Sequence, residues 1–381
     1  MYMKTDQTIL DDFQKRRNLK TSSMRQYKSA LNQYKKYNKM TLADLLNEAE
    51  IEEDDRIPQR RRTITTRLLG FRNYLTEHYK KNSVKSMMTK TITLYTTFGL
   101  EVPKLPRQSE KNMNDNPPIS FKDLPDKKII KASLHISNPL MVAIILFMSS
   151  SGSARTEMLS LSIQDFIDST RLYHNSNDIY EVLDILKERD DVVPTWKIHR
   201  QKTDKWYYTF SSPEATTAIV NYLLSIKKPL KNTDRLFQYH EVTVCYKFQE
   251  INDELGLGKK GTYNRFRSHM LRKFHASNLK NHGMSKEDIN EMQGKGQNLV
   301  DEAYFFDDPN ILREKYIEHM DAITINMDIN NISIKSPEYL ELEKLYQEIE
   351  SELSEIDNMK ERILALEKSR PTWDEFVNKE D

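Results

Sequence analysis

The stretch from Arg265 to Leu279 holds the densest group of side chains that could act on an anion. Its cationic and imidazole members are Arg265, Arg267, His269, Arg272, Lys273 and His275. On a helix, His269 and Arg272 are three positions apart and therefore share one face. An imidazole beside a guanidinium is suited to binding a phosphate. The same pattern is also typical of a basic amphipathic helix with one solvated face, and this stretch alone does not separate the two interpretations.

Three other segments contain residues that could complete a site of this kind. Arg155 follows Gly152, which ends a nearly all-apolar segment. Lys202 lies in a basic turn between two predicted strands, and Tyr304 follows Lys295 by nine positions. Taken singly, each has a structural interpretation: Arg155 as a salt-bridge partner at a helix end, Lys202 as an ordinary turn lysine, and Tyr304 as one of 19 tyrosines. Only their combination favours chemistry.

The elements expected to position these residues are mainly helices, because glycine is scarce and helix-forming residues are abundant. Helices are predicted at 6–17, 41–49, 84–98, 139–148, 214–226, 241–253, 265–280, 285–293 and 309–319, with two more beginning near Thr21 and at Pro58. Strands are predicted at 179–186, 195–198 and 206–210. The last two form a predicted hairpin, and 322–334 is expected to be extended. The predicted fold class is mainly α with a small β-sheet.

Composition along the chain predicts four segments. A basic helical module covers 1–105, a polar linker containing prolines covers 106–120, a second domain covers 121–335, and an acidic tail covers 336–381. Residues 1–110 carry 22 Lys and Arg against 13 Asp and Glu, whereas residues 336–381 carry 6 against 14. The module is therefore +9 and the tail −8, which predicts a polyanionic partner for the module.

Five arginines of the module decorate one predicted helix and are expected to contact a DNA backbone. They are Arg60, Arg61, Arg62, Arg67 and Arg72. A solvated surface is the alternative for any one of them.

The acidic tail has a seven-residue apolar period. Leu342, Ile349, Ile356 and Ile363 repeat at this spacing, and Glu352 interrupts the second row of the pattern. The period predicts either a coiled coil or an amphipathic helix docked on its own domain.

Several classes of protein are excluded or disfavoured. No apolar run approaches the ~18 residues of a membrane span, and the N-terminus does not have the apolar core of a signal peptide. The single cysteine, Cys245, rules out disulfides within the chain and a cysteine-based zinc site. There is no phosphate-binding loop of the Walker type and no acid cluster spaced for two metals. We expect a cytoplasmic protein without a cofactor or a membrane partner.

Taken in chain order, these segments resemble the motifs of the tyrosine recombinase (phage integrase) family, most closely its archaeal integrase-like branch. The resemblance covers about residues 6–325 and rests on the boxes around Arg155 and His269, with Lys202 and Tyr304 between and after them. It implies a SAM-like helical core-binding domain followed by a mixed, mostly α catalytic domain.

The resemblance also implies a role for each residue. Arg155 and Arg272 clamp the scissile phosphate, and Lys202 is the general acid that protonates the departing 5′ oxygen. His269 positions groups and transfers a proton, and Tyr304 is the nucleophile. These residue types suit the reaction, because guanidinium forks stabilise transition-state charge and the 5′ alkoxide needs an acid to leave.

The sequence departs from the family pattern at two places. Gly152 and Arg155 are spaced as G-x-x-R instead of G-x-R, a form that the resemblance associates with the archaeal branch. Lys295 stands where most members have His or Trp, and a lysine there can donate a hydrogen bond to a phosphate oxygen. Tyr316 is an alternative nucleophile, although the spacing from Lys295 favours Tyr304.

The implied function is site-specific DNA recombination, such as the integration of a mobile element, through a covalent 3′-phosphotyrosine and without metal or ATP. The implied partners are double-stranded DNA and further copies of the chain, as a homo-oligomer forming a tetramer on two DNA sites, and the protein would be associated with the nucleoid. Two alternatives stay open: a nicking-closing enzyme like the type IB topoisomerases, and a catalytically inactive DNA-binding relative.

Overall fold

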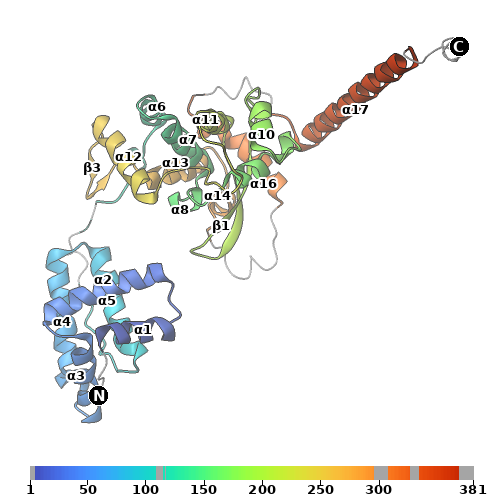
Figure 1. The fold of residues 1–381 in the computed structure, drawn as a ribbon. Coiled ribbons are helices and arrows are strands. Elements are labelled where there is room, and N and C mark those ends of the chain that lie inside the picture. Colours follow the sequence, from blue (N-terminus) through green and yellow to red (C-terminus); the bar gives the residue numbers. More distant parts are fainter. Residues whose placement is uncertain (1–4, 109–114, 116, 296–307, 327–333, 369–381) are drawn as a thin grey trace, which may run out of the picture. The chain divides into compact units, whose positions relative to one another are not determined.

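The computed structural model describes residues 5–108, 115, 117–295, 308–326 and 334–368. The chain divides into two compact units, Met1–Pro118 and Ile119–Asp381 (Figure 1). The division falls inside the predicted linker 106–120. The two units are mostly helical and the sheets are small, so the predicted fold class is confirmed.

The first unit is a bundle of five helices around one apolar core. The helices are α1 (Asp6–Arg16), α2 (Thr21–Asn38), α3 (Leu42–Asp54), α4 (Thr63–His78) and α5 (Lys81–Thr97). Tyr34 and Tyr95 are buried at the centre, and their hydroxyl oxygens lie 3.0 Å apart. Because α2 packs most extensively against α5, these two helices form one continuous face of the unit.

Two predicted helix starts in this unit have different outcomes. Thr41 caps α3 as expected, with its hydroxyl accepting from the Asp44 amide, and the helix continues to Asp54, beyond its predicted end at residue 49. Pro58 does not open α4. It precedes a short 3-10 turn, Gln59–Arg61, and α4 begins at Thr63, whose amide donates to the Glu52 carboxylate at 2.9 Å. The Glu52 side chain therefore caps the start of α4, where the sequence had suggested that Pro58 begins the helix.

The second unit packs its helices around a buried central helix, α7 (Pro139–Ser151), which contacts α11 (Pro213–Leu224) and α13 (Ser268–Asn281) most extensively. The other helices described are α6 (Lys127–His135), α8 (Arg155–Met158), α9 (Ile163–Ser169), α10 (Ile179–Leu186), α12 (Glu241–Glu254), α14 (Lys286–Met292), α16 (Pro309–His319) and α17 (Pro337–Lys368). Nearly every side chain of α7 is buried, as its continuous apolar sequence predicts.

The predicted hairpin is confirmed. Strand β1 (Thr195–Arg200) pairs antiparallel with β2 (Lys205–Phe210), with Thr195 opposite Phe210. The Thr209 hydroxyl donates to the carbonyl of Ser151 at 2.7 Å, so β2 is tied to the end of α7. A second small sheet pairs β3 (Lys259–Lys260) with β4 (Tyr263–Asn264).

Residues 179–186 form helix α10, and the prediction of a strand there is wrong. Ile179, Val182, Leu183 and Leu186 are buried at the i, i+3, i+4, i+7 spacing of a helix. Asp178 caps the helix, because its carboxylate accepts from the amides of the first turn. The β-branched and aromatic residues of this segment favoured a strand, but burial against α9 and α11 selects the helix.

The helix predicted over 265–280 begins three residues later than expected. Arg267 is extended, and α13 starts at Ser268. The Phe266 amide donates to the Asn252 side chain at 2.9 Å, so a partner on α12 satisfies it before the helix begins. Most of 322–334 lies outside the described residues, and 320–322 is a 3-10 turn.

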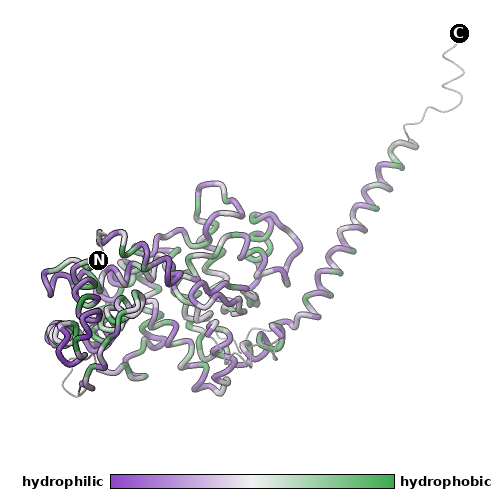
Figure 2. The backbone as a smooth tube through the Cα atoms, turned by 90° about the horizontal axis from the view of Figure 1, so that it is seen from below, coloured by the Kyte–Doolittle hydropathy of each residue, from purple (hydrophilic) through white to green (hydrophobic). Residues whose placement is uncertain are grey.

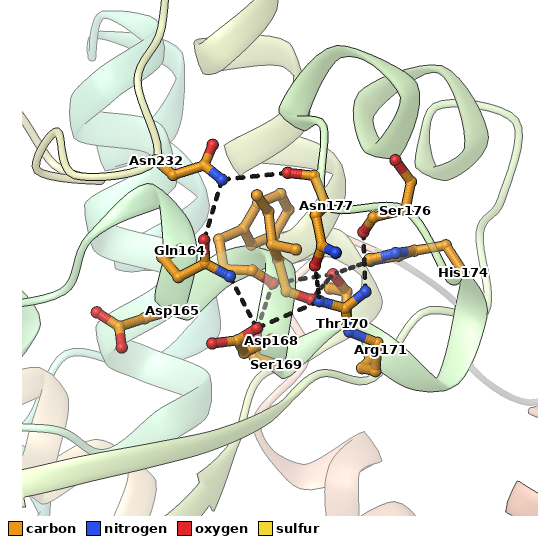
Figure 3. Close-up of polar contacts among 12 residues, drawn as sticks. Gln164, Asp165, Asp168, Ser169, Thr170, Arg171, His174, Ser176, Asn177 and Asn232 are labelled. Carbon is orange, nitrogen blue, oxygen red and sulfur yellow. Dashed lines mark hydrogen bonds and ion pairs between the residues drawn. The ribbon is translucent and has the colours of Figure 1, made fainter.

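Helix α17 begins on the body of the second unit. Leu340 is buried there, and Lys344 donates to the carbonyl of Arg171 at 3.2 Å. Arg171 in turn donates to the carbonyl of Ser176 and to the side chain of Asn177, which braces the turn that receives α17 (Figure 3). The docked-helix interpretation is therefore correct for the first turns. No described helix is long and apolar enough to cross a membrane.

Candidate functional site

A cavity of about 230 Å³ brings together three of the predicted site residues. Arg155, His269 and Arg272 line it with Ser153, Thr156 and Ser268. Arg155 comes from α8, whereas His269 and Arg272 come from one face of α13. The prediction that His269 and Arg272 face the same way is confirmed, and Arg155, which the resemblance grouped with them, lines the same cavity.

Gly152 is what allows α7 and α13 to meet at this cavity. It ends α7 with φ +64°, and an added Cβ would lie 2.5 Å from Nδ1 of His275 on α13. Its carbonyl accepts from Nη1 of Arg272 at 2.6 Å, and Nη2 of Arg272 donates to the carbonyl of Gln293 at 2.6 Å. The guanidinium is 7% exposed and is held by backbone on two sides.

Glu157 is the buried counter-ion of the site, and the sequence did not single it out. Its Oε2 lies 3.7 Å from Nη1 of Arg272 and accepts from the Tyr207 hydroxyl at 2.9 Å. Its Oε1 lies 3.3 Å from Nε of Arg200 at the end of β1. One carboxylate therefore joins α8, α13 and the hairpin, and its burial is compensated by two cations. Its only sequence signal is its place three residues after Ala154, whose amide it caps at 2.9 Å.

Arg200 was also missed by sequence reasoning, although it lies two residues before Lys202. Its Nη1 donates to the carbonyls of Gln293 and Gly294, at 3.1 and 2.6 Å. Gly294 has φ +57°, and an added Cβ would lie 2.5 Å from the Tyr207 ring. The hairpin is thus fastened to the segment that leads into Lys295.

His269 is placed to stay neutral. Partial burial of its ring and the charges of Lys273, Arg267, Arg272 and Lys295 lower its pKa below the usual 6.5. The lowered pKa favours the neutral imidazole, the form in which one ring nitrogen accepts a hydrogen bond and the other donates one.

Lys295 lies close to this group. Its Nζ donates to the side chain of Asn290 at 3.2 Å, and burial with the nearby charges of Arg272 and Arg200 lowers its pKa. A lysine with a lowered pKa gives up its proton more readily than a solvated one.

Arg155 is held by α12. Its Nη2 donates to Oε1 of Glu241 at 2.7 Å, and its Nη1 donates to Sγ of Cys245 at 2.8 Å. Its Nε is buried and has no hydrogen-bond partner among the described residues. Neither Glu241 nor Cys245 carried a sequence signal for this contact. The Glu241 carboxylate therefore takes up a hydrogen-bond donor of the Arg155 guanidinium, so another anion that binds there must compete with it.

The remaining predicted residues stand apart from the cavity or outside the described residues. Lys202 is exposed in the turn between β1 and β2, and none of the cavity-lining residues is Lys202. Tyr304 lies outside the described residues. The alternative nucleophile, Tyr316, is fully buried, and its hydroxyl donates to the carbonyl of Ser150 at 3.0 Å. Burial raises its pKa well above 10, which is unfavourable for a nucleophile.

A second candidate surface lies in the first unit, on α2 and α5. These helices carry seven Lys and Arg, four on α2 and three on α5, and neither has an Asp or Glu. A groove of about 540 Å³ runs between them, lined by Arg25, Gln26, Ser29, Ala30, Asn82, Ser83, Ser86, Met87 and Lys90. Helix α3, by contrast, carries six acidic residues and no basic ones. Charge in this unit is therefore segregated by helix.

Three of the five arginines expected to contact DNA are engaged inside the first unit, and DNA contact by the other two stays a prediction. Arg62 donates to the carbonyl of Ile57 and to Glu101, and it is 9% exposed. Arg67 forms an ion pair with Glu48, and Arg72 donates to the carbonyl of Pro106. Arg60 and Arg61 are exposed. The α2–α5 face is a basic surface that carries no acidic residue on either helix.

No model of a known protein family matches the sequence, and no curated protein sequence does. Solved structures to which this chain is similar include the lambda integrase tetramer bound to a Holliday junction (14% identity, 87% of this chain and 81% of that chain, TM-score 0.49) and XerH site-specific recombinase bound to palindromic difH substrate in a post-cleavage complex (16%, 81% and 83%, TM-score 0.48). A third is XerA recombinase (17%, 82% and 97%, TM-score 0.33). At these identities and TM-scores the likeness assigns neither an activity nor a residue role to this chain.

Proposed function

We propose that this protein is a site-specific DNA recombinase that cuts and rejoins duplex DNA through a covalent 3′-phosphotyrosine on Tyr304. The observation that carries the proposal is the cavity lined by Arg155, His269 and Arg272. It combines two guanidiniums with a neutral imidazole, and these groups suit a phosphodiester whose negative charge increases in the transition state. The buried position of Tyr316 also favours Tyr304 as the nucleophile.

Each side chain has a defined task in this proposal. Arg272 is fixed by two carbonyls and by Glu157, so its remaining edge is preorganised toward the phosphate. Arg155 supplies the second guanidinium after the phosphate replaces the Glu241 carboxylate. His269 accepts the proton of the attacking tyrosine. The bond between phosphorus and the 5′ oxygen breaks as Lys202 donates a proton to that oxygen.

The hairpin is the element that would bring Lys202 to the reacting phosphate. Its base is fastened through Arg200 to Gln293 and Gly294, while the turn that holds Lys202 is exposed. Rejoining reverses the steps, because the phosphotyrosine bond conserves the energy of the broken phosphodiester. The reaction therefore needs neither ATP nor a metal ion.

Duplex DNA would be held by both units. The α2–α5 face offers cations, hydroxyls and amides without an acidic residue, which is the composition of a phosphate-backbone contact. Residues 1–105 are therefore proposed as the core-binding domain and 121–335 as the catalytic domain. The G-x-x-R spacing of Gly152 and Arg155 favours the archaeal integrase-like branch, and strand exchange would require a tetramer on two DNA sites.

The proposal is tested by selecting DNA that stays attached to the protein after denaturation. A pool of random duplexes, each with a nick near its centre, would be incubated with the full chain and then treated with detergent. We expect enrichment of one defined sequence, linked to the protein through its 3′ end. Two such sites on one circle should recombine.

The two alternatives predict other results. A nicking-closing enzyme would relax supercoiled DNA without an enriched sequence and without strand exchange. An inactive relative would bind DNA through its α2–α5 face, but no DNA would stay attached to the protein after denaturation.

A further inference from the structure

Helix α17 carries an apolar stripe that has no partner among the described residues. Leu345, Ile349, Ile356, Met359 and Ile363 are each between 46% and 56% exposed. Figure 2 shows hydrophobic and hydrophilic residues alternating along this helix. Exposed apolar residues scattered singly are ordinary, but a continuous stripe on one helix face marks an interaction surface.

The stripe is not the face by which α17 docks on its own unit. The docked residues include Leu340, Lys344 and Glu348, which are four positions apart and contact the 171–175 turn or the core beneath it. Glu343, on the same side, pairs with Arg189 at 3.2 Å. Leu345 and Ile349 each follow a docked residue by one position, which turns them about 100° around the helix. The stripe therefore faces away from the docked side and is open to a second partner.

The spacing of the stripe fits another helix. Its apolar residues alternate three and four positions apart from Leu345 to Ile363, with Glu352 as the single polar member. This is the seam of a coiled coil, in which each side chain inserts between four residues of the facing helix. A globular partner would not require this period over so many turns.

The charges of α17 are separated along its length. Residues 348–357 contain five acidic residues and no basic one, whereas Lys360 and Arg362 follow in the next turn. Two parallel copies would place Glu352 against Glu352 inside the apolar seam, with Glu355 facing Lys360 at its edge. Two antiparallel copies would place Glu352 against Ile356 and Glu348 opposite Arg362 of the second copy, with Glu355 facing Glu355 at the edge. Separation of the two carboxylates inside the seam therefore favours the antiparallel arrangement.

We propose that α17 is a dimerisation helix that pairs antiparallel with α17 of a second copy of this chain, along the stripe from Leu345 to Ile363. The dimer has a two-fold axis between the helices, so the same surface is used by both copies and the assembly closes at two. It forms without DNA, and it does not rest on the proposed cleavage chemistry.

Sedimentation equilibrium of the full chain without DNA tests this pairing. The wild-type protein should show a monomer–dimer equilibrium. A variant with Ile349→Glu and Ile356→Glu should have a dimer dissociation constant more than about tenfold larger, because each copy would bury two carboxylates in an apolar seam. Glutamate is a good helix former, so α17 itself should persist, which circular dichroism checks.

Three further variants distinguish specific pairing from non-specific association and determine the orientation of the two helices. Leu364→Glu changes an equally exposed leucine of α17 that lies off the stripe and should leave the dimer unchanged. Glu352→Leu completes the apolar seam and should tighten the dimer. Glu355→Gln should tighten an antiparallel dimer, in which two Glu355 side chains face each other, and weaken a parallel one, in which Glu355 faces Lys360.

A wild-type chain that stays monomeric at every concentration would overturn the inference, as would a double variant that associates like the wild type. Weaker association of Glu355→Gln would overturn the antiparallel arrangement. The wild type and the double variant should capture DNA covalently at a single site to the same extent. If neither protein captures DNA, the proposed function is refuted, but this inference is not affected.

Discussion

The ion pair between Arg155 and Glu241 sets the ligand-free state of the cavity. A phosphate that binds Arg155 must displace a carboxylate 2.7 Å from its Nη2, and Cys245 fills the other side of the same guanidinium. Competition of this kind lowers affinity for any anion without changing what the site can do once the anion is bound.

Glu241→Gln should therefore bind DNA more tightly than the wild type. The amide keeps a hydrogen-bond acceptor for Arg155 but removes the charge, and the gain should be largest at low salt. Fluorescence anisotropy with duplex DNA measures it. Glu250→Gln is the matched control, because Glu250 lies on the same helix and pairs with Lys247 instead. Equal DNA affinity of the two variants would mean that Glu241 does not compete with DNA for Arg155.

Lys202→Ala should slow cleavage of ordinary DNA by roughly 10²–10⁴, the usual contribution of a positioned acid. A substrate with a 5′-bridging sulfur should be cut almost normally by the same variant, because its leaving group needs no proton. Single-turnover cleavage rates on both substrates measure the difference. If both substrates lose the same factor, Lys202 is not the acid.

Spacing alone predicted that His269 and Arg272 share one helix face, whereas only the resemblance to a known family joined Arg155 to them, because no local pattern links positions so far apart. Glu241 escaped prediction. Its contact joins positions 86 apart, and no local pattern encodes which exposed carboxylate will meet a given arginine.

At the scale of elements, the α2–α5 face is the part of the first unit most suited to DNA. The net charge of the module predicted a basic surface, but it did not identify the face, because two of the arginines that suggested α4, Arg62 and Arg67, are paired with acids elsewhere in the unit. The packing of α2 against α5 brings Arg25 and Lys90 to one groove, which the sequence does not indicate.

Replacing Arg25 and Lys90 by alanine should weaken DNA binding and flatten its salt dependence. If each contacts one phosphate, the slope of log K against log salt should fall by about 1.8, from about 0.9 per contact. The matched control replaces Arg60 and Arg61, which are exposed outside this face. Affinity titrations at several salt concentrations measure the slopes, and a larger change in the control would move the DNA contact away from α2 and α5.

The incorrect prediction of a strand at 179–186 has a physical cause that applies to other sequences as well. Its apolar residues follow the spacing of a helix, but the segment is short and rich in residues that favour strands. Where periodicity and propensity disagree, the buried face decides, and the sequence does not say what will pack against it. The hairpin 195–210 was predictable because both signals agree there.

At the scale of the whole molecule, two buried histidines should make stability depend on pH. Burial lowers the pKa of His275 to about 3 and that of His174 to about 4, from 6.5 in the unfolded chain. Both are neutral in either state above pH 6.5, so their contribution is complete there. Below it the unfolded chain binds more protons, and stability falls by about 1.4 kcal/mol per pH unit for each histidine until the folded pKa is reached.

Replacing His275 by glutamine should therefore reduce the loss of thermal stability between pH 6.5 and pH 4. The variant has a lower melting temperature at neutral pH, because a buried and well-packed ring is lost, but a shallower dependence on acid. His135→Gln, at an exposed position, is the control and should keep the wild-type slope. Thermal unfolding followed by circular dichroism across this range measures both, and parallel wild-type and His275→Gln curves would contradict the assignment.

The most direct test of the central claim is the identity of the residue that becomes attached to DNA. On a nicked duplex carrying the selected sequence, wild-type protein should give a 3′-linked adduct, and peptide mass spectrometry should locate it on Tyr304. Tyr304→Phe should abolish the adduct and leave DNA affinity unchanged. Tyr316→Phe should keep it, because that hydroxyl is buried against Ser150. An adduct that survives Tyr304→Phe, or that is lost only in Tyr316→Phe, would contradict the proposed mechanism.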